Sequence, residues 1–182
     1  MARLLLLVIY FTFFSMMIVA DEIDNQIFEF KTKYNRGDYM GAINMSENVL
    51  QQIVIKYGDN HFKELYVRQF LGDSYYEQGL FDKAIHHYSE LILINKYLYG
   101  DFHSQVANSY YQLALAYHGN GMLSNALPIY RLSILVTEKV LGKRHESLIN
   151  MLTSLVTLHF DMGQFELGKD VYLKTLKLNK LY

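Results

Sequence analysis

Histidine is the residue whose chemistry could be most telling in this chain of 182 residues, which holds seven of them. Three recur at 42-residue steps, namely His61, His103 and His145. His86 and His87 are adjacent, and neighbours on a helix point about 100° apart, so this pair cannot readily share a metal ion. The remaining two, His118 and His159, stand alone. We therefore predict no metal site, and we interpret the recurring histidines as residues that begin helices.

Other kinds of catalytic residue are equally unconvincing. The chain has no cysteine, which excludes disulfides, thiolate metal sites and a cysteine nucleophile. Its carboxylates are scattered, and it contains neither a glycine-rich phosphate loop nor a recognisable nucleophile motif. The formal net charge of −1 gives no basic footprint for nucleic acid. We expect no enzyme activity, no cofactor and no nucleic-acid partner.

The elements that carry these residues are repeated. Glycines recur at the same 42-residue steps at Gly37, Gly79, Gly121 and Gly163, and a second set recurs at Gly58, Gly100 and Gly142. Small residues keep the interval at Ala42, Ala84, Ala126 and Gly168, as do tyrosines at Tyr88, Tyr130 and Tyr172. A period of this length, kept by several residue types, is typical of a solenoid or a repeat array.

Within each unit, apolar residues recur at three- and four-residue steps on both sides of a glycine, which predicts two helices. The units cover about residues 21–57, 61–98, 103–140 and 145–180. Asp82 and Ser124 are expected to cap second helices, since their side chains can accept from first-turn N–H groups. The small residues are expected where two helices approach most closely, and the tyrosines four positions further on should fill the gap beside them.

These residues resemble a known family. The stretch from Glu138 to His145 is similar to the linker of tetratricopeptide repeats in their 42-residue, kinesin-light-chain form. Leu113–Tyr117 with Gly121 is similar to the first helix and turn of that repeat, and Ala126 and Tyr130 to its second helix. The resemblance implies an all-α fold, a right-handed superhelix of four antiparallel helix hairpins, and a role in binding other proteins.

Departures from the family limit what can be carried over. The kinesin-type groove uses paired asparagines, but the matching places hold Gln69-Phe70, Tyr111-Gln112 and Thr153-Ser154. The lysine-and-asparagine clamp for a terminal carboxylate is missing as well. The two best-known modes of peptide recognition in the family are therefore not expected here.

The resemblance nevertheless implies a concave groove lined by the first helix of each hairpin. Carried onto this sequence, the partner-binding groove consists of Tyr66, Gln69, Asp73, Tyr76, Asn108, Tyr111, His118, Asn150, Thr153, Thr157 and Phe160. This face is aromatic and mostly uncharged, which suits an extended or helical peptide. The alternative is that some of these rings only pack between hairpins.

The segment from Met1 to Ala20 is interpreted as a signal peptide that precedes the repeats. Arg3 is followed by an almost wholly apolar run from Leu4 to Ala20, and Asp21 and Glu22 end it. An uncleaved N-terminal membrane anchor is the alternative, because the length of this run lies at the lower edge of what spans a bilayer. We expect a secreted or periplasmic protein, with membrane attachment only if this segment is retained.

The sequence thus predicts a non-enzymatic interaction module, a scaffold or adaptor exported from the cytoplasm, that binds a protein or peptide in its groove. The alternative is a chaperone-like assembly factor for envelope or secreted proteins. The last helix is apolar at Val171, Leu173, Leu176, Leu178 and Leu181. Solenoid ends normally carry a polar face, so this end is expected to pair with a second copy or with another protein.

Overall fold

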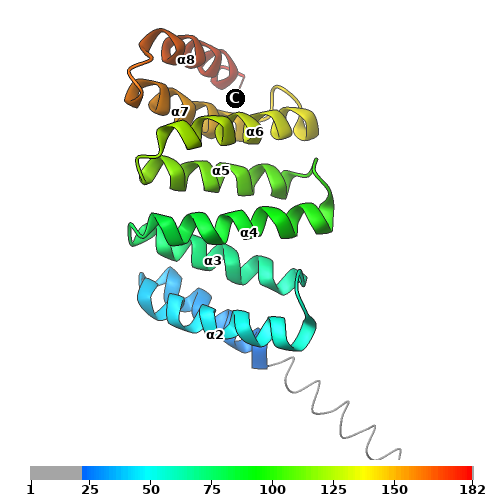
Figure 1. Cartoon of the computed structure of the whole chain (residues 1–182). Helices are drawn as coiled ribbons and strands as arrows, with labels where there is room; N and C mark the ends of the chain where they lie inside the picture. The colour runs from blue at the N-terminus through cyan, green and yellow to red at the C-terminus, as the bar shows by residue number, and fades with distance from the viewer. Residues whose placement is uncertain (1–21, 182) are drawn as a thin grey trace, which may run out of the picture.

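The computed structural model describes residues 22–181, and all regular structure in that range is helical. The first helix covers residues 22–35. It is followed by α2 (Tyr39–Tyr57), α3 (Phe62–Glu77), α4 (Phe81–Tyr99), α5 (Ser104–Gly119), α6 (Leu123–Leu141), α7 (Ser147–Asp161) and α8 (Phe165–Asn179). Consecutive helices pair as antiparallel hairpins that stack from residues 22–35 and α2 at one end to α7 and α8 at the other (Figure 1). The predicted all-α solenoid of four hairpins is confirmed.

Every turn contains a glycine in the left-handed backbone region. These glycines are evenly spaced along the chain, with φ between 70° and 92°: Gly37, Gly58, Gly79, Gly100, Gly121, Gly142 and Gly163. At the end of α3, the Gly79 N–H donates to Tyr76 O at 2.9 Å and the Leu80 N–H donates to Tyr75 O at 2.9 Å. This backbone pairing ends the helix and reverses the chain, and a side chain at position 79 would strain it.

Histidine side chains accept from backbone N–H groups at the start of three helices, as predicted. The Nδ1 atom of His61 accepts from the Lys63 N–H at 3.3 Å, and that of His103 accepts from the Gln105 N–H at 3.2 Å. His145 Nδ1 accepts from the Ser147 N–H at 3.2 Å. Because Nδ1 accepts, the proton of the neutral ring is on Nε2.

The predicted caps at Asp82 and Ser124 are wrong. Helix α4 begins directly after Leu80 and α6 directly after Met122, and neither start has a side-chain cap. The Leu80 carbonyl already accepts from the Lys83 and Ala84 N–H groups, which places Asp82 inside the first turn. Asp82 Oδ1 instead accepts from Asn120 Nδ2 of the next hairpin at 2.8 Å.

The small residues lie inside the hairpins as expected. Ala42, Ala84 and Ala126 are fully buried, and a Cβ added to Gly168 would meet the Phe160 ring at 2.6 Å. Among the matching tyrosines, Tyr88 and Tyr130 are 2% and 0% exposed. The expectation fails for Tyr172, which is 50% exposed. The second hairpin is covered by α5, which packs against α4, and the third by α7, which packs against α6. Tyr172 is exposed because no later helix of residues 22–181 packs on the fourth hairpin.

The segment interpreted as a signal peptide or anchor, Met1 to Ala20, lies outside the described residues. Within the part of the chain that the structure does describe, no helix combines the length and apolarity needed to span a membrane.

Candidate functional site

The residues of the predicted groove fall into rows that cross the first helices of the last three hairpins. An outer row consists of Tyr66, Asn108 and Asn150, each one repeat from the next. A second row consists of Gln69, Tyr111 and Thr153, followed by the pair Asp73 and Thr157. The innermost row consists of Tyr76, His118 and Phe160. The repeat therefore places side chains from α3, α5 and α7 at matching positions on one face.

The outer row is open to solvent. Tyr66, Asn108 and Asn150 are all exposed, although each sits on a helix whose other side is buried. The Lys31 ammonium lies 5.0 Å from the centroid of the Tyr66 ring, so one end of the row carries a cation–π contact. These three side chains can reach a partner without any change in the fold.

Other predicted groove residues tie the third and fourth hairpins together. The Tyr111 hydroxyl and Ser154 Oγ form a hydrogen bond of 3.0 Å, and the same hydroxyl donates to Asn150 O at 3.5 Å. His118 Nε2 pairs with Asp161 Oδ2 at 2.7 Å. Tyr111 and His118 therefore have a structural role between α5 and α7, which is the alternative that the sequence left open for the rings of this face.

Asp73 lies at the centre of a small, partly buried network. Its Oδ1 atom accepts from Gln69 Nε2 at 2.8 Å and from the Tyr88 hydroxyl at 2.6 Å. Burial raises the pKa of the Asp73 carboxyl, although both hydrogen bonds oppose this shift. Burial also raises the pKa of Tyr88, so this hydroxyl stays protonated and donates.

Sequence reasoning missed that the second helices contribute to the groove. Tyr88 and Tyr130 were expected only to fill a gap, yet the hydroxyl of Tyr130 lies 3.4 Å from His118 Nδ1. Both tyrosines thus reach from α4 and α6 towards side chains of the first helices. Their 42-residue spacing was a usable signal, but it did not reveal which polar atom each hydroxyl meets.

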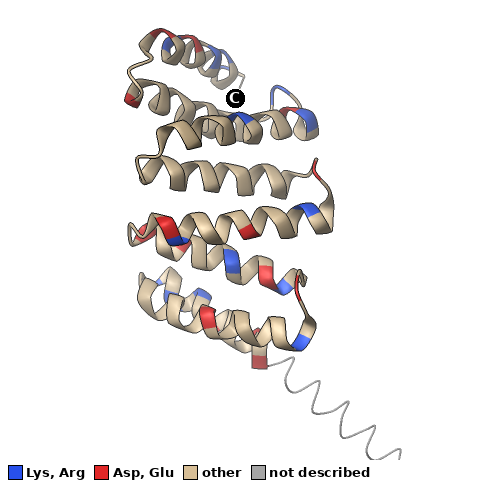
Figure 2. Ribbon diagram, viewed as in Figure 1, with Lys and Arg blue, Asp and Glu red and all other residues tan. Residues whose placement is uncertain are grey.

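The middle of the face is almost free of charge. Figure 2 shows α5 without any Lys, Arg, Asp or Glu, and in α7 only the last residue, Asp161, is charged. In residues 22–181, no three His, Asp or Glu side chains gather as they would around a metal ion. The arrangement offers amides, hydroxyls and rings, which recognise peptide groups and apolar side chains.

Two cavities adjoin these rows. The first, of about 180 Å³, lies between α3, α4 and α5, and its lining includes Tyr66, Gln69 and Asn95. The second, of about 370 Å³, lies between α7 and α8, where Thr153, Thr157 and Phe160 line it together with Tyr172 and Leu176. Three of the four α7 members of the predicted groove, all except Asn150, therefore line a cavity of the last hairpin.

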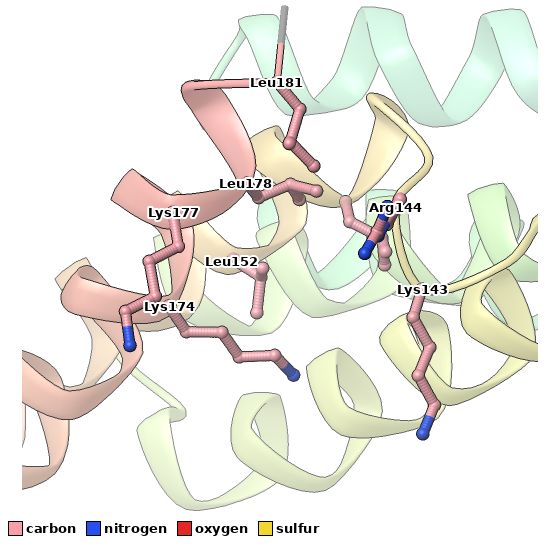
Figure 3. Close-up of a pocket in the computed structure, with 8 residues that line it drawn as sticks. Lys143, Arg144, Leu152, Lys174, Lys177, Leu178 and Leu181 are labelled. Atoms are coloured by element: carbon pink, nitrogen blue, oxygen red, sulfur yellow. The ribbon is translucent and has the colours of Figure 1, made fainter.

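A basic pocket of about 300 Å³ was not anticipated from the sequence. Figure 3 shows the cations Lys143, Arg144, Lys174 and Lys177 around an apolar floor that includes Leu152, Leu178 and Leu181. The Lys174 ammonium is paired with Glu138 Oε1 at 3.2 Å. The pocket joins the α6–α7 linker to the end of α8, and because α7 separates these segments in the sequence, no local motif announces it.

Comparisons with known proteins agree with this architecture. The sequence profile of the family "Tetratricopeptide repeat" matches residues 65–134, from within α3 to within α6. No curated protein sequence matches the chain.

Solved structures share the fold at low sequence identity. A Podosopora anserina protein with "kinesin light chain nearly identical TPR-like repeats" superposes with a TM-score of 0.76 at 18% identity, over 86% of this chain and 74% of that one. BtubC (BKLC) from P. vanneervenii gives a TM-score of 0.79 at 15% identity, over 86% of this chain and 62% of that one.

MamA from Desulfovibrio magneticus RS-1, residues 41 to the end, gives a TM-score of 0.67 at 14% identity, over 87% of this chain and 76% of that one. At such identities the likeness is one of fold. The profile match places tetratricopeptide repeats within residues 65–134, and the solved structures share the fold of stacked helix hairpins over most of the chain.

Proposed function

We propose that the protein is a non-enzymatic scaffold or adaptor that binds a peptide or protein segment along α3, α5 and α7. The outer row, Tyr66, Asn108 and Asn150, carries this proposal, since three successive repeats present an exposed polar or aromatic side chain at one register. Tyr111 and His118, by contrast, are held by contacts within the fold. The outer row is thus the row of the predicted groove in which all three residues are exposed to a partner.

The chemistry of the row favours an extended peptide. An asparagine side chain offers both a donor and an acceptor, the pair needed to hydrogen-bond a peptide group. A tyrosine ring adds apolar contact and ends in a hydroxyl. Because α5 carries no Lys, Arg, Asp or Glu, the partner segment is expected to be uncharged where it crosses that helix.

Export from the cytoplasm is the second element of the proposal. It is supported by Arg3, by the apolar run that ends at Ala20, and by the acidic residues that follow. Expression of the full chain in its native host, followed by N-terminal sequencing of the recovered protein, tests it. A new N-terminus at Asp21 is expected. An intact Met1 on a protein confined to the cytoplasm would contradict export.

A photo-crosslinking amino acid placed at position 108 tests the binding face. In native extract it should join the protein to one dominant partner, and the double variant Tyr66→Ala/Asn150→Ala should lose that product. A crosslinker at position 125, which is exposed on α6, reports background contacts.

A matched control separates binding from general damage. The variant Tyr97→Ala/Asn44→Ala removes the same residue types from exposed positions on α4 and α2. It should leave the crosslink intact. Equal loss in both double variants would contradict a groove partner. Many weak crosslinked clients in place of one partner would favour the chaperone-like alternative.

A further inference from the structure

The last hairpin has an open groove between α7 and α8. The second and third hairpins have the matching groove, but a helix of the next hairpin fills it. The cavity between α7 and α8 is lined mainly by apolar atoms, and Val156, Phe160, Tyr172 and Leu176 contribute to it. Its position in the repeat is that of the groove between α3 and α4, which α5 occupies, and of the groove between α5 and α6, which α7 occupies.

Burial at matching positions shows the difference. In α4, Tyr88 and Ile92 are 2% and 7% exposed beneath α5; in α6, Tyr130 and Ile134 are 0% and 8% exposed beneath α7. The corresponding residues of α8, Tyr172 and Leu176, are 50% and 38% exposed. Tyr172 and Leu176 are thus aromatic and apolar like their counterparts, although no helix of the described chain covers them.

The cavity volumes agree with this comparison. The groove of the second hairpin retains only about 180 Å³, and Gln105 and Ser109 of α5 form part of its wall. The groove of the fourth hairpin holds about 370 Å³, with a lining drawn from α7 and α8 alone. Leu65, Gln69, Leu91 and Asn95 of the first cavity match Ile149, Thr153, Thr175 and Asn179 of the second, two repeats later in the chain. The end groove is therefore the inner groove without its inserted helix.

We propose that this end groove binds an amphipathic helix of a partner protein, with the same register of contacts that α5 makes. The inward face of α5 carries Val106, Ser109, Leu113 and Tyr117, at i, i+3, i+7 and i+11. Asn95 Nδ2 donates to Ser109 Oγ at 2.8 Å, and Asn179 stands at the place of Asn95. The partner helix thus carries apolar residues at i and i+7 and a hydroxyl at i+3 that meets Asn179.

A second copy of the chain, stacked head to tail, does not fit the groove between α7 and α8. Such a copy would insert its first helix, residues 22–35, into the groove. The positions of α5 that face the groove are Val106, Ser109, Leu113 and Tyr117. The matching positions of the first helix are Glu22, Asn25, Glu29 and Lys33. Insertion would bury unpaired charges against apolar side chains, which is unfavourable. Within residues 22–181, the outward face of the first helix is thus polar, whereas the groove of the last hairpin accepts a helix.

Fluorescence anisotropy with a labelled peptide of residues 103–120, which contains α5, tests the proposal. Titration with the full chain should give saturable binding, and Leu176→Glu should weaken it at least tenfold. The matched control is Leu173→Glu on the same helix, which is 46% exposed and lies outside the groove lining. Because both substituted residues are exposed, both variants should keep the parent melting temperature.

A second pair of variants tests the register. Asn179→Ala should weaken binding of the parent peptide several-fold, but should have little effect on a peptide with Ser109→Ala. Absence of binding, or binding that Leu176→Glu leaves unchanged, would overturn the proposal. Sedimentation of the chain alone at tens of micromolar should show a monomer. A dimer that Leu176→Glu dissociates would mean that a second copy covers the groove, and would overturn it too.

Discussion

The Tyr88 hydroxyl donates to Asp73 Oδ1 at 2.6 Å and so joins the second helix of a hairpin to the face that the first helix presents. Asp73 is the one acid among the predicted groove residues, and Gln69 supplies its other hydrogen bond. The tyrosine therefore fills the hairpin with its ring and satisfies a partly buried carboxylate with its hydroxyl.

Tyr88→Phe should destabilise the protein by about 1–3 kcal/mol, because it removes a donor from a carboxylate that has reduced access to water. Urea unfolding at pH 7 measures this loss. Tyr97→Phe is the control, since Tyr97 is exposed on the same helix. In an Asp73→Asn background the loss should become smaller. An equal loss in both backgrounds would mean that the hydroxyl does not act through Asp73.

Stability should decrease as the pH falls from about 6.5 towards 4, because His87 must be neutral in the fold. Burial, with smaller effects from His86, Arg68 and Lys83, lowers the pKa of His87 to about 4. The unfolded chain then binds the proton first, so the stabilisation is complete above the unfolded pKa and is lost as the pH approaches the folded one. The change amounts to roughly 3 kcal/mol.

Unfolding of His87→Phe across this range measures that contribution, since phenylalanine can keep the stacking of His87 on Tyr75, whose ring centroids are 5.5 Å apart. The variant should show a flatter pH dependence than the parent chain, and the neighbour variant His86→Phe should not. Burial raises the pKa of Asp73, so its contribution has the opposite sign, and the comparison must be made between variants.

His103→Ala should cost about 0.5–2 kcal/mol, because the first turn of α5 loses the acceptor for the Gln105 N–H. His103→Asn should restore most of the stability, since asparagine is a good cap. Thermal unfolding at pH 7.5 compares the two. If alanine and asparagine gave the same melting temperature, the ring of His103 would matter only for its packing on Tyr99.

Ala126→Leu should cost about 1–3 kcal/mol by overpacking the third hairpin, where Ala126 is fully buried. Asn125→Leu adds an apolar side chain at the neighbouring exposed position and serves as the control. Melting temperatures of both variants give the answer. Equal values would show that α5 and α6 do not approach most closely at Ala126.

The fold could be predicted because the residues that recur every 42 positions are required by the local backbone around them. Turn glycines need a positive φ, and histidines that begin helices need only their own first turn. The caps expected at Asp82 and Ser124 were wrong because the helices begin with backbone pairing, and Asp82 bonds Asn120 of the next hairpin. Only the folded arrangement reveals such a partner.

The repeat register indicates which residues share a face of the candidate groove, but it does not reveal contacts between hairpins. The repeat register puts Tyr66, Asn108 and Asn150 at matching positions, and the structure shows them exposed. It could not separate them from Tyr111 and His118, whose partners, Ser154 and Asp161, belong to the next hairpin. The exposure of Tyr172 was missed because the repeat pattern does not show which hairpin lacks a helix packed on it.

The even spacing of the turn glycines has a consequence for how such a chain can evolve. Since the grooves of the second and third hairpins each accept a first helix in the same register, an in-frame duplication of one whole repeat, such as residues 100–141, would add one hairpin and leave its neighbours correctly seated. An insertion of another length within a helix would shift the later residues of that helix out of this register. The protein can therefore change length in whole hairpins.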